Sequence, residues 1–163
     1  MQICFTILET DGIALIKYGV RRMGTLLGRT VLIVEDEPLI AIDLGQSFED
    51  AGASVTIVGC LSDALAAVSA GGISAAVVDR VLPDGNSSSL LRLLTELGVP
   101  YIVVSGHSGS KCEGIGAAAY FSKPADPNRL VRAVEEMLCA MSASANSSRA
   151  KPDHDARSPV IAA

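Results

Sequence analysis

Several residues able to bind a metal ion and a phosphoryl group follow short apolar runs in this chain. Glu35 and Asp36 follow one run, Asp79 ends a second, and Ser105 and Lys123 follow two more. If the runs are strands of one sheet, these side chains meet at one edge. Carboxylates this close together repel one another and are costly to bury without a partner. Mg²⁺ binds carboxylate oxygens and keeps waters that a phosphoryl oxygen can replace. The pattern predicts a phosphoryl site between Mg²⁺ and a lysine.

Asp79 is the best candidate for a nucleophile. It stands alone at the end of a predicted central strand, where a carboxylate can form an acyl phosphate. Phosphoryl transfer depends mainly on positioning and on neutralising charge. The glycines at 71–72 and 106–109 lack the Lys-Ser/Thr ending of a nucleotide-binding P-loop. The phosphoryl donor is therefore not expected to be ATP bound on this chain.

The elements that must position these residues alternate in period. Apolar, β-branched runs predict five strands, and apolar residues spaced by three and four predict helices between them. The expected strands are 30–34, 54–58, 75–78, 101–104 and 119–122, and the expected helices are 38–51, 62–69, 90–97 and 130–141. Short connections and right-handed crossovers favour an α/β fold, a doubly wound five-stranded parallel sheet covered on both faces. Ligands of such sheets bind beyond the carboxyl ends of the strands.

Composition narrows the possible classes of protein. The chain has 163 residues, 49% of them hydrophobic, and a formal net charge of -5. This length suits one domain with tails, and the acidity disfavours sequence-independent binding of nucleic acid. No apolar run approaches the roughly 18 residues of a membrane span. Four scattered cysteines without metal-site spacing are typical of reduced thiols, so a cytoplasmic location is expected.

Three segments are predicted along the chain. Residues 1–29 form an N-terminal extension without a clear apolar period, and residues 30–140 form the folded domain. Residues 141–163 are rich in serine and polar residues that compete with helical hydrogen bonds, which predicts a disordered tail. The segment after the last predicted helix is too short for a DNA-binding unit of the usual kind, so no direct contact with nucleic acid is expected.

Four motifs together carry a resemblance to a known family. The segments VLIVEDEP, VVDRVLPDG, YIVVSG and AYFSKP, in this order, resemble the receiver domain of two-component response regulators. Each motif alone is weak, and the resemblance rests on the ordered set, which covers about residues 30–140. It implies a flavodoxin-like receiver fold and a role in phosphorelay signalling. The expected partners are a histidine kinase or histidine phosphotransferase and a downstream protein.

The resemblance assigns a role to each site residue. Glu35 and Asp36 would hold Mg²⁺ together with Asp79, and Asp79 would accept the phosphoryl group. The backbone carbonyl of Val81 would complete the protein's ligands to the metal, and Lys123 would bind the phosphate. Ser105 and Tyr120 would be the switch hydroxyl and the switch aromatic residue. Receivers commonly have a cis peptide at the position before Pro124. The protein would phosphorylate itself once rather than act as a turnover enzyme.

The fourth helix of the family is expected to be short or absent. Residues 106–116 contain four glycines, and each glycine inside a helix costs about 1 kcal/mol relative to alanine. This loop, the segment VEDEPLIA and the pair Ser105-Gly106 are similar to the FAT-GUY type of stand-alone receiver. In that subgroup strand four ends Phe-Ala-Thr-Gly, whereas this chain has Val-Val-Ser-Gly.

The sequence is also compatible with other functions. Each site residue alone is more often a surface, capping or packing residue, and only their joint placement at four strand ends favours a phosphorylation site. A receiver-like scaffold that binds partners without phosphate is one alternative. A metal-dependent phosphohydrolase is a weaker one, because that class places an Asp-x-Asp nucleophile motif after strand one. Val81 has no polar side-chain atom to orient water, which predicts a long-lived phosphoprotein.

Overall fold

The computed structural model describes residues 9–10, 13–14, 25–106 and 118–149. Five strands form one parallel sheet, in the order β4-β3-β5-β8-β9. Their bounds are β3 (Thr30–Val34), β4 (Ser54–Val58), β5 (Ala75–Asp79), β8 (Tyr101–Ser105) and β9 (Ala118–Ser122). The predicted doubly wound α/β fold is confirmed.

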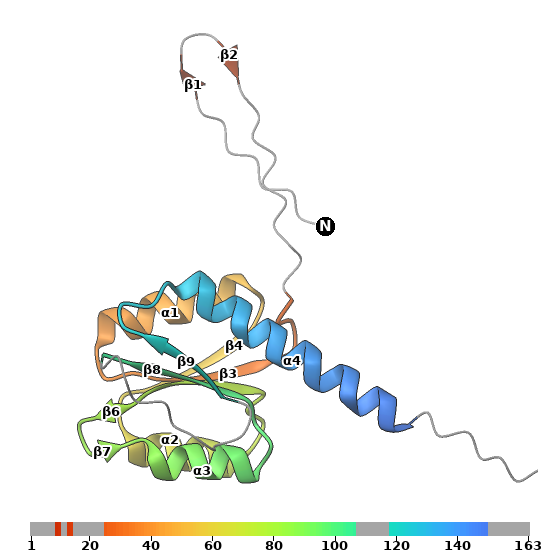
Figure 1. Cartoon of the computed structure of the whole chain (residues 1–163). Helices are drawn as coiled ribbons and strands as arrows, with labels where there is room; N and C mark the ends of the chain where they lie inside the picture. Colours follow the sequence, from red (N-terminus) through yellow and green to blue (C-terminus); the bar gives the residue numbers. More distant parts are fainter. Residues whose placement is uncertain (1–8, 11–12, 15–24, 107–117, 150–163) are drawn as a thin grey trace, which may run out of the picture.

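Helices cover both faces of this sheet (Figure 1). The helices are α1 (Pro38–Asp50), α2 (Leu61–Ala70), α3 (Ser88–Glu96) and α4 (Pro127–Arg149). Helices α1 and α4 contribute to one hydrophobic cluster, and α2 and α3 contribute to a second cluster on the opposite face. The sheet is therefore the middle layer of three.

Strand β3, which lies between β4 and β5, shows why this sequence forms a buried sheet. Val31 and Ile33 pack into the cluster under α1 and α4, whereas Leu32 and Val34 pack into the other cluster. Side chains alternate between the two faces of a strand, so a strand covered on both faces must be apolar at every position. Strand β4 lies at the edge and is more exposed.

Two short hairpins accompany the main sheet. Strands β1 (Glu9–Thr10) and β2 (Ile13–Ala14) pair antiparallel near the N-terminus. Strands β6 (Val81–Leu82) and β7 (Gly85–Asn86) pair antiparallel directly after β5. The sequence predicted only a turn at residues 82–85, because strands of two residues have too few positions to show a period.

The folded domain extends beyond both predicted boundaries. Leu26 is only 1% exposed and belongs to the core under α1 and α4, and its N–H donates to the carbonyl oxygen of Ala51 over 3.1 Å. Helix α4 continues to Arg149, so the expectation of disorder from residue 141 is wrong as far as this residue. Ala is a strong helix former, and the Ser142 hydroxyl donates to the Leu138 carbonyl inside the helix.

Residues 107–117, where the fourth helix of the family was expected to be short or absent, lie outside the described residues. Strand β8 is described up to Gly106, and the chain is described again from residue 118, where β9 begins. The label α4 therefore belongs to the helix Pro127–Arg149 that follows β9. Across the described ranges, every helix is too short or too polar to cross a bilayer.

Candidate functional site

The carboxyl ends of the parallel strands place the predicted site residues at one edge of the sheet. Parallel hydrogen bonding continues past the strand ends. The N–H of Glu35 donates to the Val58 carbonyl over 3.1 Å, and that of Lys123 donates to the Ser105 carbonyl over 2.9 Å. The ladder therefore fixes the backbone on which the functional side chains stand.

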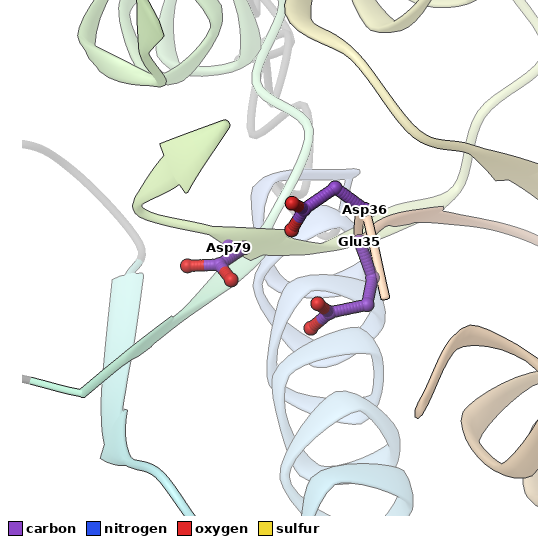
Figure 2. Close-up of side chains that lie close together, drawn as sticks. All are labelled: Glu35, Asp36 and Asp79. Carbon is purple, nitrogen blue, oxygen red and sulfur yellow. The ribbon is translucent and has the colours of Figure 1, made fainter. Parts of the chain in front are cut away.

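Three carboxylates meet at this edge. Glu35, Asp36 and Asp79 each offer one oxygen atom, and these atoms all lie within 4.8 Å of one another (Figure 2). The Glu35 side chain is 4% exposed and that of Asp79 is 10% exposed, whereas Asp36 is exposed. The cluster is thus buried on one side and open to solvent on the other.

Lys123 binds two of these carboxylates. Its Nζ atom lies 2.6 Å from Oδ2 of Asp79 and 3.0 Å from Oε2 of Glu35. Partial burial by itself lowers the pKa of Lys123, but the hydrogen bonds and charges of Asp79 and Glu35 outweigh this effect and raise it above its ordinary value. The ammonium group therefore remains charged at neutral pH.

The charges of these four side chains favour a divalent cation. Three acidic side chains and only one ammonium group lie near one point, so acidic groups are in excess. Carboxylate oxygens are the ligands that Mg²⁺ prefers, and the exposed side at Asp36 leaves room for waters and a phosphoryl oxygen. The residues present therefore fit the predicted metal ion. Glu37 is exposed and is not part of the cluster, although its N–H donates to Oε1 of Glu35.

The hairpin after β5 continues from the acidic cluster. Val81 is the first residue of β6, and its N–H donates to Oδ1 of Asp79 over 3.2 Å. Its side chain is 64% exposed. One oxygen of Asp79 thus accepts from this backbone amide, and the other accepts from Lys123.

The two predicted switch residues lie on neighbouring strands. Ser105 is the last residue of β8, and Tyr120 lies on β9 opposite Val103. The Tyr120 side chain is 38% exposed, so its ring lies partly in solvent. The Lys123–Pro124 peptide is cis, as the resemblance implied.

A hollow of about 650 Å³ opens beside the site between α1 and the start of α4. Glu35 and Lys123 line it at the end nearest the acidic cluster, and the rest of the lining is mostly apolar. On the same helix α1, Leu39 is 83% exposed and Ile42 is 63% exposed. The acidic cluster is therefore bordered by exposed apolar surface.

The comparisons with known proteins agree with this geometry. The family model of the response regulator receiver domain matches residues 31–135, well over half of the chain. This chain belongs to the response regulator receiver domain family. It is thus a receiver domain of two-component signalling. A comparison with curated protein sequences finds no match.

Solved receiver structures resemble this receiver along nearly their whole length. A response regulator receiver protein from Sinorhizobium medicae WSM419 is 25% identical with a TM-score of 0.65, over 69% of this chain and 96% of that one. A CheY-like receiver domain from Methanospirillum hungatei JF-1 is 26% identical with a TM-score of 0.65, over 71% and 98%. A sensor protein from Polaromonas sp. JS666 is 27% identical with a TM-score of 0.63, over 69% and 98%.

Sequence reasoning missed one carboxylate near this site. Asp84, at the tip of the β6–β7 hairpin, accepts hydrogen bonds from the N–H groups of Leu61 and Ser62 over 2.7 and 3.0 Å. The Pro-Asp-Gly signal identified a turn there. The two partners of Asp84 lie 23 and 22 positions earlier in the chain, and no local pattern indicates a contact at that separation.

Proposed function

We propose that this receiver accepts a phosphoryl group on Asp79 and thereby switches a surface that a partner protein reads. The observation that carries the proposal is the position of Asp79, whose carboxylate contacts Lys123 and lies within 4.8 Å of carboxylate oxygens of Glu35 and Asp36. A histidine kinase or a histidine phosphotransferase would supply the phosphoryl group. The setting would be a phosphorelay in the cytoplasm.

The proposed step forms one bond and breaks one. A carboxylate oxygen of Asp79 attacks phosphorus, the P–N bond of the donor phosphohistidine breaks, and the electron pair returns to the imidazole nitrogen. The Lys123 ammonium, already 2.6 Å from Asp79, neutralises charge on the phosphoryl oxygens. The Val81 N–H, which donates to Oδ1 of Asp79, helps to fix the direction of the attacking carboxylate.

Mg²⁺ would be held by the carboxylates of Glu35, Asp36 and Asp79 and by the Val81 carbonyl, and it would stabilise the negative charge of the phosphoryl group in transfer. The proximity of the three carboxylates supports this assignment.

Ser105 and Tyr120 are proposed to pass the change on to a partner. The Ser105 hydroxyl would move toward the new phosphate, and Tyr120 would turn into the space that it leaves. Their places on adjacent strands support this coupling. The free energy available to the switch equals the difference between the interactions of the phosphate with the two states.

The apolar surface on α1 supports docking of the phosphoryl donor. Leu39 and Ile42 are exposed beside the hollow that Lys123 and Glu35 line. A donor that covers this surface would bring its phosphohistidine to the open side of the acidic cluster. No role in binding nucleic acid or a membrane is proposed.

Within the family we propose the FAT-GUY type of stand-alone receiver. The support is the segment VEDEPLIA, the pair Ser105-Gly106 and the glycine-rich segment that follows. We also propose that the chain consists of an N-terminal extension, a receiver domain and a C-terminal tail. The receiver domain includes Leu26 and the whole of α4.

Two alternative functions predict different experimental results. A scaffold that never takes phosphate would bind partners equally well after Asp79→Asn. A phosphohydrolase would release inorganic phosphate with turnover. We rank the second lower because the lone aspartate is the last residue of β5, whereas Glu-Asp-Glu, and no Asp-x-Asp motif, follows β3.

Incubation of the full chain with acetyl phosphate and Mg²⁺, followed by intact-mass measurement, tests the proposal. Wild type is expected to gain one phosphoryl group, and Asp79→Asn and wild type with a chelator are expected to gain none. Asp63→Asn, at an exposed position in the first turn of α2, serves as a second aspartate variant that keeps Asp79 and is expected to label like wild type. Equal labelling of wild type and Asp79→Asn would remove Asp79 from the proposed role.

A further inference from the structure

Asp84 joins two backbone segments that lie on either side of the acidic cluster. Its carboxylate accepts both Leu61 N–H (2.7 Å) and Ser62 N–H (3.0 Å) in the first turn of α2. Asp84 itself lies in the turn of the β6–β7 hairpin, between Leu82 and Gly85, which are paired residues. These two bonds therefore tie the hairpin to the start of α2; we call them the Asp84 clamp.

The hairpin side of the clamp leads to the phosphoacceptor. The hairpin begins at Val81, whose N–H donates to Asp79. Its base is closed by Ser87, whose N–H and hydroxyl both donate to the Arg80 carbonyl over 3.1 and 3.3 Å. Ser87 is only 1% exposed. A displacement of the hairpin tip would therefore be passed to the backbone at Val81.

The helix side of the clamp leads to the acidic pair. Gly59 lies between β4 and α2, and its backbone is so close to Glu35 and Asp36 that a Cβ there would lie 3.8 Å from the Glu35 carbonyl oxygen and 3.9 Å from Asp36 Cα. The N–H of Glu35 also bonds to Val58, the last residue of β4. The start of α2 is thus connected through Gly59 to the backbone of both acidic residues.

The geometry points to Asp84 as a positioning residue, which holds the Val81 side of the proposed metal site at a fixed distance from the Asp36 side. This inference rests on the proposed function for its meaning, because it concerns the same site. Asp84 touches no reacting atom. It acts through the two backbone segments, and carboxylates that bind a metal need such support to keep their geometry.

The ionised state of Asp84 agrees with this role. The backbone N–H groups of Leu61 and Ser62 lower the pKa of its carboxyl group below the ordinary value. The carboxylate is therefore charged at neutral pH, and a charge at the first turn of a helix is favoured by the helix dipole. The Asp84 clamp is thus present at neutral pH.

Mg²⁺ affinity of the full chain, measured by calorimetric titration, tests the inference. The variants are Asp84→Asn, which keeps one acceptor oxygen, and Asp84→Ala, which keeps none. The matched control is Asp63→Asn, because Asp63 is an exposed acidic residue in the same first turn of α2. The expected order of affinity is wild type and Asp63→Asn first, then Asp84→Asn, and Asp84→Ala last, about tenfold below wild type.

A second measurement separates positioning from stability. The rate of labelling by acetyl phosphate is followed against Mg²⁺ concentration, at a temperature where thermal unfolding shows every variant to be folded. Loss of the clamp is expected to raise the Mg²⁺ concentration for half-maximal rate and to leave the rate at saturating Mg²⁺ little changed.

The two results that would overturn the inference are distinct. Wild-type Mg²⁺ affinity in Asp84→Ala, with only a lower melting temperature, would make Asp84 a helix cap and nothing more. An equal loss in Asp63→Asn and Asp84→Asn would reduce the effect to the charge near α2. If wild type took no phosphate, the proposed function would fail, while the Mg²⁺ affinities would still decide the role of Asp84.

Discussion

Lys123 Nζ lies 2.6 Å from Asp79 Oδ2, although the two residues stand 44 positions apart in the chain. The same ammonium group lies 3.0 Å from Glu35. It therefore occupies the space between two carboxylates that are mostly buried. The parallel sheet makes this contact possible, because β3, β5 and β9 end at the same edge.

Replacement of Lys123 by alanine is expected to make the fold depend on Mg²⁺. Glu35 and Asp79 lose their shared cation, so the melting temperature in chelator falls, and Mg²⁺ raises it more than in wild type. Labelling by acetyl phosphate is expected to slow about a hundredfold, as for the loss of one charged group at a transferring phosphoryl group. Arg92→Ala, on the exposed surface of α3, is the control. An equal rise in melting temperature with Mg²⁺ in wild type, Lys123→Ala and Arg92→Ala would contradict this expectation.

The raised pKa of Lys123 gives a prediction for alkaline pH. A basic group whose pKa is higher in the folded state stabilises the fold fully below its ordinary pKa, about 10.4 for lysine. This contribution is lost as the pH rises through the higher folded value. Wild type should therefore lose its advantage in free energy of unfolding over Lys123→Ala above about pH 10.4. Urea denaturation of both proteins below and above this pH measures the difference in their free energies of unfolding. A difference that does not change with pH would refute the ion pairing.

Leu26 is expected to be essential to the core although it precedes the first strand of the sheet. It is 1% exposed, and Leu→Ala at such a site costs about 2–5 kcal/mol in free energy of unfolding. Leu27, 79% exposed, is the matched control, and its replacement by alanine should change stability by at most about 0.5 kcal/mol. Urea denaturation of the full chain compares the two. Similar losses would show that the segment before β3 is not packed as described.

The lifetime of the phosphorylated protein is expected to depend on Val81. Val81 is exposed, its N–H bonds to Asp79, and its side chain carries no polar atom. Val81→Asn adds an amide that can orient water toward the acyl phosphate, so hydrolysis should quicken about tenfold, below the range for a full general base. Loss of label is followed by mass after the donor is removed. Leu97→Asn, at the end of α3, is the control and should decay like wild type. Loss of the wild-type label within seconds would contradict the predicted long lifetime.

The main sheet could be predicted because each strand carries a strong local signal. Runs such as 31–34 and 75–78 are apolar at every position, and glycines such as Gly52 and Gly98, both with positive φ, mark where helices end. The site followed from the same signal, since the topology of a parallel sheet brings the strand ends together. Glu35, Asp36, Asp79 and Lys123 were all predicted to converge, and they do.

Contacts without a local pattern could not be predicted. The burial of Leu26 depends on packing against α1 and α4, far along the chain, and the Asp84 clamp joins a turn to a helix that precedes it. The length of α4 was underestimated because serine-rich segments are often not helical. Here the alanines of the segment, which are strong helix formers, favour continuation of the helix to Arg149 instead.

Reduction by borohydride tests most directly whether Asp79 is the phosphoacceptor. Borohydride converts an aspartyl phosphate, but not a free aspartate, into homoserine. After labelling with acetyl phosphate and Mg²⁺, the full chain is reduced, cleaved and sequenced by mass spectrometry. We predict homoserine at position 79 alone, and none in a sample without donor. Homoserine at another aspartate, or an unmodified residue 79 in a labelled protein, would contradict the proposed function.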